Sequence, residues 1–197
     1  MPILTAITLV LCLLFSPRAM SNDVLFINAR LLTMADGPVA SPPTELLVRN
    51  DRIAAIGAAL APANEENTLT IDLAGGYLMP GLAEMHAHVP GNQDKEYRDD
   101  VLFLFVANGI TTARGMLGSP DHLELREALE RQEILGPRLF TSGPSFNGNR
   151  VSGPDRAREM VRSQAAAGYD FLKIHPGLTR TEYDAMAATA AELDIAF

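Results

Sequence analysis

The sequence predicts an α/β protein, the front half of a TIM-like (β/α)8 barrel preceded by a small β-sandwich segment. Short apolar runs separated by turns fill the chain up to about residue 79. After that, apolar strands recur about every 30 residues with helical stretches between them, the spacing of βα units in a parallel sheet. A closed barrel needs about 250 residues, whereas residues 80–197 provide four units and the start of a fifth. We therefore expect a half-barrel, with a complete open α/β domain as the alternative.

The chain begins with a segment typical of a secretory signal peptide, expected over residues 1–21. Residues 6–15 are apolar and uncharged, a run too short to span a bilayer as a helix. Ala19 and Ser21 then give the small-x-small pattern that signal peptidase cleaves. We expect an exported protein, periplasmic or extracellular, that matures near Asn22. A buried N-terminal helix is the alternative.

Residues 22–79 are expected to form the β-sandwich segment, because no helical periodicity of useful length is found there. The apolar runs are short and end at turns that contain Asn, Asp or Gly, which is typical of strands in a small β domain. The expected strands cover residues 24–27, 45–48, 53–56 and 69–73.

Residues 80–197 alternate between expected strands and helices. Gly109, Gly136 and Gly168 follow three of the helices, where a left-handed residue commonly stops a helix. A fourth helix is expected to begin at Thr179, because Glu182 three residues later completes a capping box. The strands are expected at 82–89, 110–116, 138–142 and 170–174, and the first three helices at 96–108, 120–134 and 154–167.

The composition argues against several classes of function. A net charge of −8 without a basic stripe argues against binding to nucleic acid or to anionic membrane surfaces. Cys12 is the only cysteine and lies in the signal peptide, so the mature chain has no thiol for catalysis, disulfides or zinc binding. The expected partner is a small molecule. No membrane association is expected after signal cleavage. Whether the protein forms a homo-oligomer is left open.

His86 and His88 follow an apolar run and the Pro80-Gly81 pair, at the end of an expected strand. Side chains alternate along a strand, so the two imidazoles share one face, where their nitrogens can bind a single metal ion. The chain has only four histidines, and this pair predicts a metal site. Two unrelated surface histidines are the alternative.

Lys173 is one of only two lysines and lies within the apolar strand expected over residues 170–174. A lysine taken out of water loses its charge more readily, and a neutral amine beside a metal ion can add carbon dioxide to become a bridging carbamate. A lysine that extends to solvent is the alternative. His175 shares the face of Lys173 and either contacts substrate or steadies the metal-bound water, or else it caps the strand end. His122 is expected to be solvated.

Taken in order, these motifs resemble those of the amidohydrolase superfamily of metal-dependent hydrolases, above all its imidazolonepropionase-like and prolidase-like branch. The resemblance covers almost all of the chain after the signal peptide. The chain departs from the usual pattern at Glu84 and Gly115, where an aspartate is commoner. The three similar segments are the metal motif, the second-strand signature and the segment with the carboxylated lysine, at residues 79–88, 109–114 and 169–174.

The resemblance implies a site with two divalent metal ions, usually zinc, held by His86, His88 and a Lys173 carboxylated by carbon dioxide. It implies hydrolysis of C–N bonds in amide, cyclic amide or dipeptide-like substrates, with His175 as a substrate-binding candidate. The general-base aspartate and two further histidines of the family would lie beyond Phe197. We therefore expect the chain as given to be a truncated, inactive fragment of a hydrolase. A non-catalytic relic and a small metal-binding α/β module are the alternatives.

Overall fold

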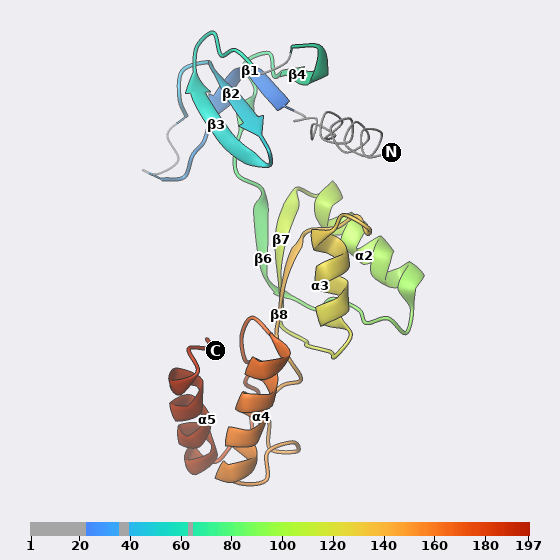
Figure 1. Ribbon diagram of the computed structural model, residues 1–197, viewed down its shortest axis with the longest axis vertical. Helices are drawn as coiled ribbons and strands as arrows, with labels where there is room; N and C mark the ends of the chain where they lie inside the picture. The colour runs from blue at the N-terminus through green and yellow to red at the C-terminus, as the bar shows by residue number, and fades with distance from the viewer. Residues whose placement is uncertain (1–22, 36–39, 63–64) are drawn as a thin grey trace, which may run out of the picture. The chain divides into compact units, whose positions relative to one another are not determined.

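The computed structural model describes residues 23–35, 40–62 and 65–197. The expected signal peptide, including Cys12, lies outside the described residues. The chain separates into two compact units, one that ends at Pro80 and one from Gly81 to Phe197 (Figure 1). Within the described ranges, no helix has both the length and the apolar character needed to cross a membrane.

The first unit is built on one mixed β-sheet with the strand order β3-β2-β1-β4. Strand β1 (Asp23–Leu31) is central, because it pairs antiparallel with β2 and parallel with both β4 and β5. Only a 3-10 turn, Glu65–Asn67, interrupts the strands of this unit in its described part. The other strands are β2 (Thr44–Arg49), β3 (Arg52–Gly57), β4 (Thr68–Asp72) and β5 (Tyr77–Leu78).

The described part of this unit forms a single sheet, so it shows one layer of the expected β-sandwich segment and no second layer. A sandwich requires a second sheet packed against an apolar face. Ile53 and Ile56 of β3 are instead 64% and 52% exposed, and the buried core is limited to Ala29, Leu31 and Leu46. The apolar pattern predicts strands with a face to bury, but it does not tell what covers that face.

The second unit contains a parallel sheet with the order β6-β7-β8. Isolated bridges join Ser142 to Phe171 and Phe171 to Ala196, so the parallel arrangement continues past β8 without closing a barrel. The strands are β6 (Leu82–Ala87), β7 (Ile110–Gly115) and β8 (Arg138–Thr141), and the helices are α2 (Lys95–Ala107), α3 (His122–Glu130), α4 (Pro154–Ala167) and α5 (Arg180–Glu192).

The strand expected over residues 170–174 is not continuous, since only Phe171 and Ile174 form bridges. The loop after β8 explains the interruption. The Phe146 amide donates to the Lys173 carbonyl, and the His175 amide donates to the Phe146 carbonyl, each at 2.8 Å. This loop, rather than β8 itself, pairs with the outer half of the segment, so no regular ladder forms.

The helix predictions are confirmed where local signals decide the boundaries. Helix α4 covers the expected residues, and the capping box of Thr179 and Glu182 begins α5. Gly168, with φ of 85°, is the left-handed stop expected after α4. Helix α3 ends earlier than expected, with Gln132 in the left-handed region. Gly136 has a packing role instead, because a Cβ there would lie 2.7 Å from Leu129.

The packing of the second unit defines two faces of its sheet. Ala87, Ala113 and Leu139, from β6, β7 and β8, are buried against helices in one cluster. Leu172 is buried with Met160 and other residues of α4 and α5 in a second cluster. Because side chains alternate along extended backbone, the neighbours of these residues lie on the opposite face, which we call the open face.

Candidate metal centre

The His86 and His88 side chains lie next to each other at the end of β6. Their ring centroids are 5.3 Å apart, with a 45° angle between the ring planes. Ala87 between them is buried on the helix side, so both imidazoles are on the open face, where they are exposed. The His86 amide donates to Glu84 Oε1 at 2.8 Å, beside an irregularity in the pairing of β6 with β7. Two neighbouring imidazoles fit the nitrogen preference of zinc.

Lys173 lies on the same open face, within the segment that extends the sheet beyond β8. Leu172 and Ile174 on either side of it pack against the helices. Phe171, two residues before Lys173, is contacted from β7 by the Arg114 guanidinium, whose Cζ is 4.3 Å from the ring centroid. Lys173 itself is half-buried. The predicted alternation of residues 171–174 is therefore found, although the strand is not regular.

The predicted ligands come from two different segments of the parallel arrangement. Strands β7 and β8 lie between β6 and the segment of Lys173. Across the described part of the chain, no cluster of three or more His, Cys, Asp and Glu side chains is placed to hold a metal ion. The chain thus offers an imidazole pair, and a lysine on the same face as a further candidate.

His175 is exposed and is fixed through its backbone rather than its side chain. Its amide donates to the Phe146 carbonyl at 2.8 Å. This bond holds the end of the Lys173 segment and leaves the imidazole accessible. The alternatives from the sequence, contact with substrate or with the metal-bound water and capping of the strand end, are all compatible with this position.

A polar cluster fixes the loop that follows His88. Asp121 accepts hydrogen bonds from the Ser119 hydroxyl and the Asn92 amide. Burial raises the pKa of Asp121, but these two bonds and one from its own amide outweigh burial and leave the pKa below its usual range. Gly91 allows this close approach, because a Cβ there would lie 2.9 Å from Asp121 Oδ2. The loop is thus held in place next to the imidazole pair.

The expectation that His122 is solvated is wrong. Only 1% of its surface is exposed, and its Nδ1 lies 3.4 Å from Thr141 Oγ1. Its Nε2 is buried without a hydrogen-bond partner among the described residues. Burial lowers the pKa of His122, while Asp121 and the carbonyls of Pro90 and Val89 oppose the shift. The sequence marks the start of a helix here but not which side of it faces the sheet.

Sequence reasoning missed Asp170, which anchors the segment that carries Lys173. Its Oδ2 accepts from the Thr141 amide at 2.7 Å and from Arg126 Nη1 at 2.9 Å. Arg126 also donates to the Gly168 carbonyl at 3.0 Å. These partners are 29 and 44 residues from Asp170 in the chain, so no local pattern marks them.

Comparison with known proteins supports the resemblance found in the sequence. The chain is 32% identical over 162 residues to adenine deaminase of Serratia proteamaculans (strain 568), an alignment that covers 73% of this chain and 24% of that protein. A crystal structure of an amidohydrolase matches with a TM-score of 0.77, 22% identity and coverage of 88% of this chain and 55% of the other. A Xaa-Pro dipeptidase with methionine bound in its active site matches with a TM-score of 0.73, 19% identity and the same coverage.

These two structural matches establish the fold, and this chain aligns with part of each matched protein. The chain spans about a quarter of the length of the adenine deaminase and about half of each matched crystal structure. The sequence profile of the amidohydrolase family matches residues 77–197, which is more than half of the chain. The chain therefore belongs to the amidohydrolase family.

Proposed function

We propose that this chain carries part of the active site of a metal-dependent hydrolase that cleaves C–N bonds. The observation that carries the proposal is the imidazole pair of His86 and His88, with centroids 5.3 Å apart, on the face that also bears Lys173. In this proposal the parallel sheet is the front half of a (β/α)8 barrel, and the open face is its interior. The carboxyl ends of barrel strands are where such enzymes gather their reacting groups.

In this proposal His86, His88 and Lys173, the last as a carbamate, would together hold two divalent metal ions. Zinc held there would supply a Lewis acid and a more acidic water. The other residues named here hold the ligands in position. Glu84 binds the backbone of His86, and Asp170 ties the Lys173 segment to the amide of Thr141.

The substrate class is proposed from the structural relatives together with the exposed ligands. One relative is named a Xaa-Pro dipeptidase, and we propose an amide, cyclic amide or dipeptide-like small molecule for this chain. His175, exposed two residues beyond Lys173, is the proposed contact to that substrate. We also propose that the protein is exported to the periplasm or the cell exterior, on the strength of its N-terminal sequence alone.

A hydrolysis assay tests this function on a purified protein that carries this chain together with the proposed rear half of the barrel, called the full-length protein below. The substrates are Xaa-Pro dipeptides, N-acyl amino acids and a cyclic amide. We expect a chelator to abolish turnover and added zinc to restore it. His86→Asn should lower turnover by about a hundredfold or more, because loss of a metal ligand should cost at least as much as loss of a residue that orients a ligand. Lys95→Ala, which changes the other lysine, is the control and should retain activity. Turnover that survives both the chelator and His86→Asn would contradict the proposal.

A further inference from the structure

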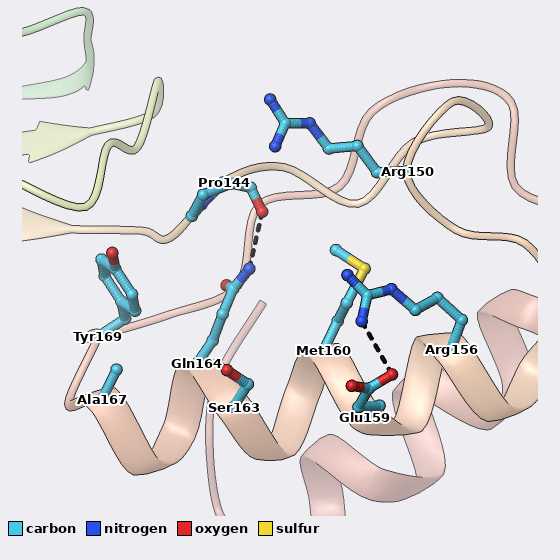
Figure 2. A pocket seen from close by; sticks show the side chains of 9 residues that line it. All are labelled: Pro144, Arg150, Arg156, Glu159, Met160, Ser163, Gln164, Ala167 and Tyr169. Carbon is cyan, nitrogen blue, oxygen red and sulfur yellow. Dashed lines mark hydrogen bonds and ion pairs between the residues drawn. The ribbon is translucent and has the colours of Figure 1, made fainter.

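A pocket of about 430 Å³ lies on the helix side of the second unit, between α4, the loop after β8 and Tyr169 (Figure 2). This volume is within the range of roughly 300–1,000 Å³ typical of small-molecule sites. Met160 lines the pocket and also packs into the core beneath α4 and α5. The pocket therefore opens on the opposite side of the sheet from the imidazole pair.

The floor of the pocket contains both polar and apolar groups and is held in place by hydrogen bonding and packing. Gln164 is 6% exposed, and its Nε2 donates to the Pro144 carbonyl at 2.7 Å (Figure 2). Gly143 makes room for this side chain, because a Cβ there would lie 2.5 Å from Gln164 Cδ. The thioether of Met160 and the ring of Tyr169 complete the lining. A ligand with an apolar body would therefore bind in a pocket that is already formed.

Two arginines give one rim of the pocket a positive charge. Both arginines line the pocket; in Figure 2 the Arg156 guanidinium lies beside Met160, and the Arg150 guanidinium extends over Pro144. Arg156 Nη1 is paired with Glu159 Oε2 at 2.8 Å, whereas the Arg150 side chain has no hydrogen bond or ion pair within the described ranges. Two arginines and one glutamate leave one net positive charge, which matches a ligand with a single negative charge.

We propose that this pocket binds a small organic carboxylate with an apolar body. Arg150 is the main partner of the carboxylate, since guanidinium and carboxylate form paired, charge-assisted hydrogen bonds. Arg156, shared with Glu159, provides the second positive group. The body of the ligand packs on Met160 and on the ring of Tyr169. A phosphate dianion fits this rim less well, because its second charge would face Glu159 unpaired.

Benzoate is the probe that tests this assignment, titrated into purified full-length protein after treatment with a chelator, so that no metal competes for the carboxylate. Binding is followed by calorimetry and by saturation-transfer NMR. We expect Arg150→Gln to weaken benzoate binding by about tenfold or more, equivalent to about 1.4 kcal/mol. Arg156→Gln should weaken it by a smaller factor. Benzyl alcohol and inorganic phosphate should each bind about tenfold more weakly than benzoate.

Arg158→Gln is the matched control. Arg158 lies on α4, as Arg156 does, and its side chain pairs with Asp155 at 2.7 Å. It does not line the pocket. Its replacement should leave benzoate binding unchanged. The proposal is overturned if benzoate does not bind, if it binds Arg150→Gln as tightly as the unchanged protein, or if phosphate binds more tightly than benzoate. Because the test uses neither metal nor turnover, its result is independent of the proposed hydrolase function.

Discussion

His122 is a buried histidine whose protonation opposes folding. Its side chain is 1% exposed, and burial lowers the pKa from the ordinary value of 6.5. The unfolded chain therefore binds a proton at a higher pH than the folded chain does. Stability is fully present above about pH 6.5 and falls as the pH decreases toward the lowered pKa of the folded state.

We predict that His122→Gln removes this part of the pH dependence. Below pH 6.5, one proton is taken up only by the unfolded state. The free energy of unfolding should then change with pH by up to about 1.4 kcal/mol per pH unit. Urea unfolding of the full-length protein at several pH values from 7.5 to 5 measures the slope. The variant should show a flatter profile below pH 6.5, even if its stability at pH 7.5 is lower. An unchanged slope would mean that the folded protein accommodates the charged imidazole.

Lys173 is the residue on which the two-metal proposal depends. We predict that Lys173→Ala in the full-length protein loses metal and activity together, because the proposed bridge between the ions is removed. Short carboxylic acids in solution should restore part of the activity by occupying the place of the carbamate. Turnover with and without added acetate or propionate is the measurement, and Lys95→Ala is the control. A Lys173→Ala protein with full turnover would exclude the carbamate.

At the scale of elements, the start of α5 shows how a local motif is also used in tertiary packing. The Glu182 amide donates to Thr179 Oγ1 at 3.3 Å, and Glu182 Oε2 accepts from the Thr179 amide at 2.8 Å. Glu182 Oε1 also accepts from the Gly153 amide, next to the start of α4, at 2.7 Å. Hydrogen bonds from the backbone and hydroxyl of Thr179 and from Gly153 lower the pKa of Glu182. One side chain thus serves both helix starts.

We predict that Thr179→Ala lowers the free energy of unfolding by about 1 kcal/mol, the usual cost of removing an N-cap hydroxyl. Thr179→Ser keeps the hydroxyl and should stay close to the unchanged protein. Denaturant unfolding of the three proteins under the same conditions measures the difference. Equal stability of the alanine and serine variants would show that the hydroxyl does not stabilise α5.

Elements were predictable from the sequence where neighbouring residues decide them. Pro154 and Gly168 mark the ends of α4, and the Thr179 capping box marks the start of α5. The alternation that places His86 and His88 together also holds, because Ala87 between them is buried on the helix side. These features depend on contacts within a few residues, which a single sequence contains.

The sequence was insufficient where a distant partner decides the structure. Residues 170–174 do not form a regular strand because their backbone hydrogen bonds go to three separate segments, at Thr141, Phe146 and Ala196. His122 is buried because its side of α3 packs near Thr141. The bond from Arg126 to Asp170 spans 44 residues. None of these contacts leaves a periodic or compositional signal near the residues that they affect.

At the scale of the whole molecule, both units expose apolar side chains on the faces of their sheets. Ile53 and Leu69 in the first unit are 64% and 60% exposed, and Leu82 and Phe140 in the second are 49% and 42% exposed. Burial of such groups is worth about 25 cal/mol per Å². Association that buries these faces against other protein surfaces is therefore energetically favourable.

We predict that residues 22–197 expressed alone self-associate and hydrolyse no amide. Sedimentation velocity should show species larger than a monomer. Phe140→Ser and Leu82→Ser together should reduce them, because they remove two of the exposed apolar groups. A soluble monomer with a sharp cooperative unfolding transition and metal-dependent turnover would contradict this prediction.

Metal analysis of the purified full-length protein tests the central claim most directly. The measurement is the number of zinc, manganese, iron and cobalt ions per chain, by inductively coupled plasma mass spectrometry, in the unchanged protein, His86→Asn/His88→Asn, Lys173→Ala and Lys95→Ala. We predict about two ions per chain in the unchanged protein and in Lys95→Ala, and a loss of both from the double histidine variant and from Lys173→Ala. Equal metal content in all four proteins would contradict the assignment of His86, His88 and Lys173 as metal ligands.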